Sequence, residues 1–289
     1  MKKSYLMLHV AVILAGFTGV FGKLIQVNEV MLVWYRVLFS AAILFFVVKL
    51  LQIKKLGSFS EAFKVSKPGL ILALHWVFFY ASIKYANISI GVVCYCLTSF
   101  FTAIFEPLIN RKRFNVIQLA LSLLTLIGIS LIFHFDASYQ LGIFLGVISS
   151  AFAALYTIYN ERLVKHYDSR LMMYYQMVAS TALVSLLIPF YYYAFPQQVY
   201  VPTTNDIIYL FLLALVCTVG LYVMFAEVLK KISAFTVNLS FNLEPIYAII
   251  MAFLFFKEGQ QVNLSFYVGL AFVTSSVVLQ TILSIKKKG

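Results

Sequence analysis

The chain has 289 residues, of which 63% are hydrophobic and only 11% charged, with a mean hydropathy of +0.95. A soluble domain is about half apolar and about a quarter charged, so this composition cannot build a water-facing surface. The formal net charge is +12, but the basic residues are too scattered among apolar runs to form a nucleic-acid groove. The composition therefore predicts an integral membrane protein and excludes a nucleic-acid partner.

Ten apolar segments are long enough to cross a bilayer, which takes about 20 residues each. They cover approximately residues 5–21, 30–51, 68–85, 88–109, 116–133, 141–159, 171–194, 207–228, 234–256 and 264–285. The first segment is long for a signal peptide, lacks a small-x-small cleavage site and is followed at once by another apolar segment. We therefore expect it to be a retained first span.

The positive charges fall on one side of this predicted membrane layout. With the N-terminus in the cytoplasm, 18 of the 22 Lys and Arg residues lie in cytoplasmic loops or termini. Lys23, Lys84 and Lys257 lie on the other side, and Arg36 lies within a span. Positive residues concentrate in cytoplasmic loops, and omitting one span would reverse every later loop. The pattern predicts a multi-pass protein of a bacterial inner membrane with both termini in the cytoplasm.

Short matches between the two halves indicate an internal repeat. Each match recurs after 140 to 148 residues: Tyr35-Arg36 with Tyr175-Gln176, Asn87-Ile88-Ser89 with Lys231-Ile232-Ser233, and Asn115 with Asn263. Because five spans per half is an odd number, the second half enters the membrane from the opposite side. The expected fold is all-α, with two inverted five-helix repeats in residues 1–135 and 138–289, a plan that recurs among secondary transporters.

One motif resembles a known family. Residues 243–248 read Leu-Glu-Pro-Ile-Tyr-Ala and lead to Lys257-Glu258, and the first half carries Thr98 to Ala103 followed by Glu106-Pro107. With Arg36 early in the second span, this is similar to the drug/metabolite transporter superfamily, and most closely to its EamA-type branch. The first half departs from the pattern, since no Pro matches Pro245 and Arg113 stands near the place of Glu258.

The resemblance implies a ten-helix transporter in which spans one, three, four, six, eight and nine line a central cavity. It also implies a small metabolite as substrate, and export of amino acids or related solutes, because such exporters are frequent in this branch. No cofactor is implied. A fold of this kind serves many solutes, so the likeness does not identify one.

Ionisable side chains at membrane depth are costly and are functional candidates by default. Glu244 lies near the middle of the ninth span, next to Pro245, which removes a helical hydrogen bond and predicts a helix break. Asn238 and Asn242 precede it, and Thr98 lies in the first-half counterpart. Arg36 is a candidate partner for Glu244 or for a substrate carboxylate, although a structural kink and a snorkelling Arg are the alternatives.

Three further groups lie toward the cytoplasmic side and are candidates for a gate or for proton coupling. Glu106 and Glu227 stand close to basic residues, so salt bridges are their simpler interpretation. His75 has a side chain that exchanges protons in the physiological range. Protons are therefore the hypothetical coupling ion, with Glu244, Glu106 and His75 as the candidate carriers.

Aromatic residues make up 17% of the chain and recur at helical spacing in three spans. The stripes are Trp76, Phe79 and Tyr80 in the third span, Phe152, Tyr156 and Tyr159 in the sixth, and Tyr222 and Phe225 in the eighth. An aromatic pocket with a few polar groups suits a small amphipathic solute. Packing is the alternative role for each of them.

Other function classes lack their motifs. Cys94, Cys96 and Cys217 lie in apolar runs without Cys-x-x-Cys spacing, so neither a zinc site nor a disulfide framework is expected. Gly-x-Ser-x-Gly, His-x-x-x-His and ATP-binding motifs are absent, which leaves an intramembrane enzyme as a remote alternative. The predicted function is secondary transport of a small molecule within a lipid bilayer, and a flippase for lipids or lipid-linked sugars is the runner-up. Oligomeric state stays open.

Overall fold

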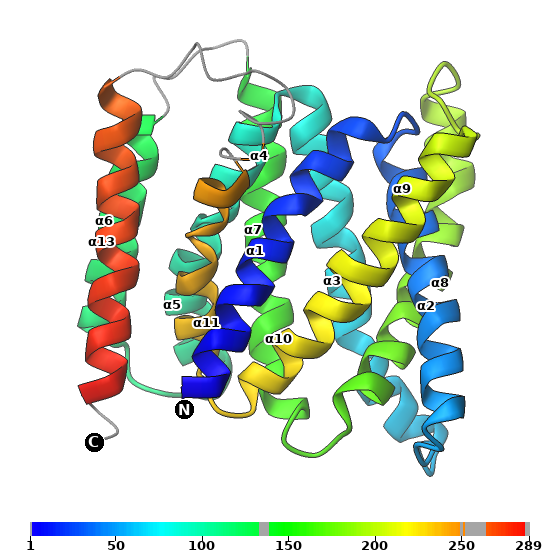
Figure 1. Ribbon diagram of the computed structural model, residues 1–289, viewed down its shortest axis with the longest axis horizontal. Coiled ribbons are helices and arrows are strands. Elements are labelled where there is room, and N and C mark those ends of the chain that lie inside the picture. Colours follow the sequence, from blue (N-terminus) through cyan, green and yellow to red (C-terminus); the bar gives the residue numbers. More distant parts are fainter. Residues whose placement is uncertain (1, 133–138, 249–250, 252–263, 287–289) are drawn as a thin grey trace.

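The computed structural model describes residues 2–132, 139–248, 251 and 264–286, and all regular structure in them is helical (Figure 1). The elements are α1 (Lys2–Leu24), α2 (Glu29–Leu50), α3 (Phe59–Tyr85), α4 (Ile88–Tyr95), α5 (Leu97–Asn110), α6 (Val116–Ile132), α7 (Gln140–Leu163), α8 (Ser169–Ala194), α9 (Thr204–Ala214), the π-helix η2 (Leu215–Gly220), α10 (Leu221–Leu229), α11 (Ala234–Phe241) and α13 (Leu264–Lys286). Residues 244–248 are also helical.

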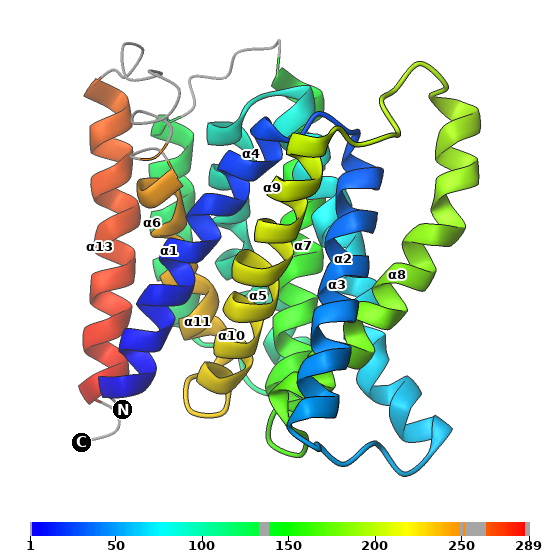
Figure 2. The same ribbon diagram turned by 45° about the vertical axis from the view of Figure 1, so that its right-hand side comes forward.

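These elements form the ten predicted spans, the ninth of which is described as far as Ala248. Among the described residues, seven helical segments are long and apolar enough to cross a membrane, and Val116–Gly128 is a shorter apolar helix. Among the described residues, three spans are not continuous α-helices: α4 and α5 share the fourth, α9, η2 and α10 share the eighth, and a turn at residues 242–243 interrupts the ninth. The start of α1 and the end of α13 lie at the same edge of the bundle, as an even number of spans requires (Figures 1 and 2).

The third span begins nine residues earlier than hydropathy predicts. Ser58 caps α3, because its side chain accepts a hydrogen bond from the backbone N–H of Glu61 at 3.2 Å. Serine is a favoured N-cap residue, since its oxygen satisfies one of the unpaired N–H groups of the first turn. The first turns of α3 carry charged residues that lower the hydropathy, so the helix extends beyond its apolar part.

Close helix contacts hold α3 in the middle of the bundle, against α7 and α8. Gly69 of α3 lies directly on the backbone of Gln176 in α8, and Gly146 of α7 lies against Ser82 and Cys94. Small residues allow membrane helices to approach closely, where van der Waals packing replaces the hydrophobic effect. At one edge, α6 and α13 lie side by side (Figure 2).

Matching caps begin the fourth and ninth spans. The Asn87 side chain accepts from the N–H of Ile90 at 2.8 Å, and the Ser233 side chain accepts from the N–H of Thr236 at 3.4 Å. The two caps are 146 positions apart, so in the structure Asn87 corresponds to Ser233. The sequence comparison pairs Asn87 with Lys231 instead, which is two residues too early. Asn115 caps the fifth span through the N–H of Ile117, whereas Asn263, Lys257 and Glu258 lie outside the described residues.

Candidate functional site

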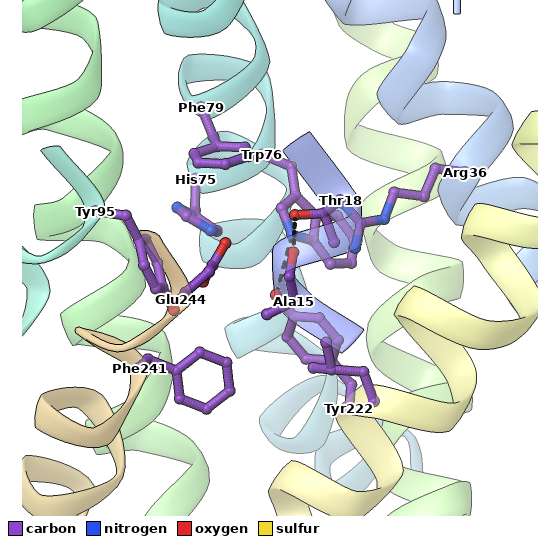
Figure 3. Close-up of a pocket in the computed structure, with 11 residues that line it drawn as sticks. Ala15, Thr18, Arg36, His75, Trp76, Phe79, Tyr95, Tyr222, Phe241 and Glu244 are labelled. Atoms are coloured by element: carbon purple, nitrogen blue, oxygen red, sulfur yellow. Dashed lines mark hydrogen bonds between the residues drawn. The ribbon is translucent and has the colours of Figure 1, made fainter. Parts of the chain in front are cut away.

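A buried cavity of about 30 Å³ lies between the two halves of the bundle (Figure 3). That volume accommodates about two water molecules. One cation, one carboxylate and one imidazole meet aromatic rings in its wall. The lining residues come from spans one, two, three, four, eight and nine: Ala15, Thr18, Arg36, His75, Trp76, Phe79, Tyr95, Leu221, Tyr222, Phe241 and Glu244.

A second void of about 10 Å³ shares part of this wall, including His75 and Tyr222, and adds Tyr156 and Thr157 from the sixth span. The spans that the family resemblance implies as cavity-lining all contribute to the two voids. Arg36 adds the second span to them. The structure thus brings together residues that lie up to 229 positions apart, from Ala15 to Glu244.

Arg36 is fully buried and held on every nitrogen of its guanidinium group. Nε donates to the Thr218 hydroxyl at 2.8 Å, Nη1 donates to the Tyr80 hydroxyl at 2.9 Å, and Nη2 donates to the carbonyl of Cys217 at 3.1 Å. The guanidinium carbon lies 3.9 Å from the centroid of the Trp76 ring. A buried cation is stabilised by such hydrogen bonds and by the face of an aromatic ring. The snorkelling alternative is wrong, because only 1% of Arg36 is exposed.

The π-helix η2 supplies two of these acceptors. Its wider turn changes the direction of the backbone groups, and the Thr218 hydroxyl bonds to the carbonyl of Leu213, five residues earlier, at 2.9 Å. Single π-turns inside α-helices occur frequently at functional sites. The carbonyl of Cys217 and the hydroxyl of Thr218 are available to Arg36 because η2 packs against α2.

Glu244 lies at a break in the ninth span. Asn242 and Leu243 form a turn closed by short-range bonds, from the N–H of Asn242 to the Leu239 carbonyl and from the N–H of Leu243 to the Ser240 carbonyl, both at 3.1 Å. Pro245 has no N–H to give the carbonyl of Phe241, so the regular helix cannot run through this point. The predicted break therefore lies two to three residues before Pro245.

The carboxyl group of Glu244 points into the cavity beside His75 (Figure 3). Only 3% of Glu244 is exposed. It lines the same void as Arg36, but no salt bridge joins these two side chains. A guanidinium group and a carboxyl group that line one cavity without a salt bridge between them can receive a ligand.

His75 is oriented by Ser149 of α7. Its Nδ1 lies 3.0 Å from the Ser149 carbonyl oxygen and 2.8 Å from the Ser149 hydroxyl, which in turn donates to the carbonyl of His75 at 3.0 Å. We assign the proton to Nδ1, because the Ser149 carbonyl can only accept and the Ser149 hydroxyl donates to the His75 carbonyl. In the neutral ring Nε2 is then an unprotonated acceptor, on the opposite side of the ring from Ser149.

The aromatic wall is tied together by a hydrogen bond between two rings. Trp76 Nε1 donates to the Tyr222 hydroxyl at 3.0 Å, and the two rings meet nearly edge to face with centroids 5.2 Å apart. The ring centroid of Tyr222 also lies 5.9 Å from that of Tyr156 and 5.8 Å from that of Phe225. Edge-to-face pairs are a preferred arrangement of buried aromatic rings. Trp76, Phe79 and Tyr222 therefore line the cavity as predicted, whereas Tyr80 lines neither void and instead accepts a hydrogen bond from Arg36.

None of the predicted polar residues Asn238, Asn242 and Thr98 lines the cavity wall, and the two asparagines belong to a neighbouring network. Asn238 donates to Thr102 at 2.8 Å and accepts from Thr157 at 3.0 Å. Asn242 donates to Ser99 at 3.2 Å, whereas the hydroxyl of the buried Thr98 has no hydrogen-bond partner among the described residues. Hydrogen bonds between polar side chains join helices inside a membrane. The two asparagines therefore join the broken ninth span to α5 and α7 next to Glu244.

Three other predicted residues lie away from the cavity. Glu106 is 3.6 Å from Lys112. Glu227 accepts from Ser169 and from Lys230, each at 2.6 Å. Tyr159 is 37% exposed and lines a separate groove between α3 and α7. Glu106 and Glu227 thus pair with lysines, which is the simpler of the two interpretations that the sequence left open, and of the three candidates on the cytoplasmic side only His75 lines the cavity.

Several cavity residues were missed at the level of sequence. Tyr95 and Phe241 are aromatic residues in spans that the family resemblance places at the cavity, so that signal was available. Ser149 and Thr218 carried no signal, because serine and threonine are common in membrane helices and bond their own backbone. Among the described residues, no group of three or more His, Cys, Asp or Glu side chains is placed to hold a metal ion.

The chain is a helical membrane protein with a buried cavity between its two halves. Comparison with known proteins identifies the family: the model of the EamA-like transporter family matches residues 2–134 and again residues 140–282, so this chain belongs to that family. A protein of Clostridium kluyveri described as an uncharacterized transporter is 22% identical, over 94% of this chain and 91% of its own length. A crystal structure covers 100% of both chains with a TM-score of 0.74 at 13% identity, which shows the shared fold.

Proposed function

We propose that this transporter moves a small zwitterionic metabolite, with amino acids as the first class to test, by alternating access between residues 1–135 and 138–289. The supporting observation is that Arg36 and Glu244, one from each half, line one cavity without a salt bridge between them. The substrate ammonium group pairs with Glu244. Arg36 uses three of its five N–H donors within the protein, which leaves two for a substrate carboxylate.

The aromatic residues suit the remainder of such a solute. Trp76, Phe79 and Tyr222 form a wall on which an apolar side chain is desolvated, whereas the charged ends select its polar groups. The enclosed aromatic cavity favours a small solute over a lipid, which requires a cleft open to the bilayer. For this reason we rank the flippase second.

The volume of the cavity bears on the mechanism. At about 30 Å³ it is too small for an amino acid, so this conformation corresponds to a closed state. Substrate binding then requires the two halves to separate on one side of the membrane. The breaks at Cys96 and Asn242 and the π-turn of η2 are the points at which the lining helices depart from regular geometry. Such broken helices characterise transporters that rock around a midplane site.

The proposal also includes the direction of transport and the ion that drives it. The distribution of positive charge supports a bacterial inner-membrane location with both termini in the cytoplasm, and the family resemblance favours export. His75 and Glu244 are the groups that exchange protons with the cavity. Export would thus be driven by proton movement in the opposite direction.

Efflux from proteoliposomes tests the proposal. Purified protein is reconstituted, the vesicles are loaded with labelled amino acids, and efflux is compared for the wild type, Glu244→Gln and the control Glu106→Gln. We expect Glu244→Gln to lower the efflux rate about tenfold or more, because it loses a charged hydrogen bond to the substrate ammonium group. The control Glu106→Gln keeps the wild-type rate, because the Glu106 carboxylate lies near Lys112 and away from the cavity. If no amino acid leaves the vesicles with protein faster than those without it, the amino-acid proposal is refuted.

A second experiment tests the role of Arg36 by changing the substrate instead of the protein. Amines that correspond to the transported amino acids but lack the carboxylate are offered to the same vesicles. We expect them to move about tenfold more slowly, because the free N–H donors of Arg36 remain unpaired. Equal rates for the amine and the amino acid would exclude recognition of the carboxylate.

A further inference from the structure

A groove of about 500 Å³ lies between α3 and α7, separate from the central cavity. Its lining residues are Lys64, Lys67, Pro68, Leu70, Ile71, Tyr159, Arg162 and Leu163. Lys64, Lys67 and Arg162 are exposed, so the groove opens on the outer flank of the bundle. It combines three cations with an apolar wall and contains no carboxylate.

The positive charge of the groove is not neutralised by the protein. Neither Lys64 nor Lys67 forms an ion pair with another residue of the described chain, and the Lys67 ammonium lies 4.9 Å over the ring of Phe63. Within the described part of the chain, the hydrogen bonds of Arg162 go to neutral groups at the end of α5. Its Nη2 donates to the Ile109 carbonyl at 2.9 Å, and its Nε donates to the Asn110 side chain at 2.8 Å.

These contacts hold Arg162 in place while they leave its charge available. Arg162 is in the last turn of α7, and the two lysines lie in the first turns of α3, so the cations lie near one end of the bundle. All three belong to the set of positive residues that predicts the cytoplasmic face. Below them along the helices, Leu70 and Ile71 continue the groove as an apolar surface toward the membrane interior.

We propose that this groove binds an anionic glycerophospholipid of the cytoplasmic leaflet. The lipid phosphate lies among Lys64, Lys67 and Arg162, and an acyl chain packs along Pro68, Leu70 and Ile71. Basic pockets between membrane helices on the cytoplasmic side are suited to anionic lipid head groups. The apolar wall distinguishes this site from one for free phosphate, which would leave that surface uncovered. The proposal is independent of the transported solute.

Lipid titration of the purified full-length protein tests this assignment. The unfolding temperature in detergent is measured with added phosphatidylglycerol, phosphatidylcholine or inorganic phosphate, and bound lipids are counted by native mass spectrometry. We expect phosphatidylglycerol alone to raise the unfolding temperature. In Lys64→Gln/Lys67→Gln its apparent affinity falls about 30-fold, since each juxtamembrane cation contributes about fivefold.

A matched control removes charge elsewhere on the same face. Lys54→Gln/Lys55→Gln has the same change in net charge, in the exposed loop between α2 and α3, and keeps the wild-type response. Equal responses to both lipids would overturn the proposal in favour of a merely apolar groove. An equal effect of inorganic phosphate, or an equal loss in the control, would also overturn it. Native mass spectrometry of the wild type is decisive even where a variant fails to fold, because an equal count of the two lipids excludes the assignment.

Discussion

The Sγ atom of Cys96 lies 3.8 Å from the carbonyl oxygen of Asn242, at the points where the fourth and ninth spans are broken. The two residues are 146 positions apart, the same separation as the N-caps Asn87 and Ser233. Equivalent points of the two halves therefore meet inside the bundle. Tyr95 directly precedes one break and Glu244 follows the other, and both line the cavity. The internal repeat thus places two irregular backbone segments next to the candidate site.

Arg36→Lys tests whether the geometry of the guanidinium group is required, since the charge is retained. A lysine ammonium cannot reach Thr218, Tyr80 and Cys217 together, so buried polar groups lose their partners. We expect a loss of about 2 to 3 kcal/mol in the free energy of unfolding and loss of transport. Denaturant unfolding in detergent micelles measures the first and proteoliposome efflux the second.

Tyr80→Phe is the matched control for Arg36→Lys, because it removes only the acceptor of Nη1. Its expected cost is about 1 kcal/mol. If the Arg36→Lys protein is as stable as Tyr80→Phe and still transports the solute, the geometry of the guanidinium group is not required.

His75→Ala tests the proposed proton coupling. Ser149 fixes the proton on Nδ1, so Nε2 is the atom that can accept a proton on the cavity side of the ring. We expect the variant to keep exchange of labelled for unlabelled solute across the vesicle membrane but to lose uphill transport driven by a pH gradient. Uphill transport at the wild-type rate would rule out His75 as a proton carrier.

Hydropathy, charge and the cost of buried ions predicted much of this molecule. Ten spans follow from apolar length and loop charge, and Arg36 and Glu244 were found because ionisable groups inside a membrane require partners. The break at Cys96 was not found, since neither proline nor glycine marks it. The π-turn at residues 215–220 had no signal either, because the apolar run continues through it without a proline.

The case of Tyr159 shows how periodicity alone misplaces a side chain. At about 100° per residue, Tyr159 lies about 60° around α7 from Tyr156. That rotation is enough to carry Tyr159 from the cavity side to the groove between α3 and α7. Which side of a stripe faces the cavity depends on the neighbouring helices, and a single sequence does not contain their positions.

Gly69→Ala tests the contact between α3 and α8. A Cβ atom at this position would lie 2.6 Å from the Cα of Gln176 and would overlap its carbonyl group, and backbone cannot move aside as a flexible side chain can. The helices must separate, which disrupts the bond from Ser180 to the Gly69 carbonyl at 2.7 Å. We expect a loss of about 3 kcal/mol or more in the free energy of unfolding. The control Gly57→Ala, whose Cβ meets only Glu61 at 3.8 Å, leaves stability nearly unchanged, and equal stability of the two variants would refute the close contact.

We expect the carboxyl group of Asp168, the N-cap of α8, to make the free energy of unfolding depend on pH. Its hydrogen bond with the Arg170 side chain and the backbone N–H groups of Arg170 and Leu171 hold the pKa of this carboxyl below its ordinary value. The charged form therefore stabilises the folded protein above the ordinary pKa, and this contribution disappears as the pH falls through the lowered pKa. Asp168→Asn keeps a good N-cap but loses the pH dependence, whereas Asp168→Ala costs about 1 kcal/mol at neutral pH. Unfolding curves between pH 3 and 7 measure both effects, about one proton being involved. An unchanged pH profile in Asp168→Asn would show that this carboxyl does not contribute.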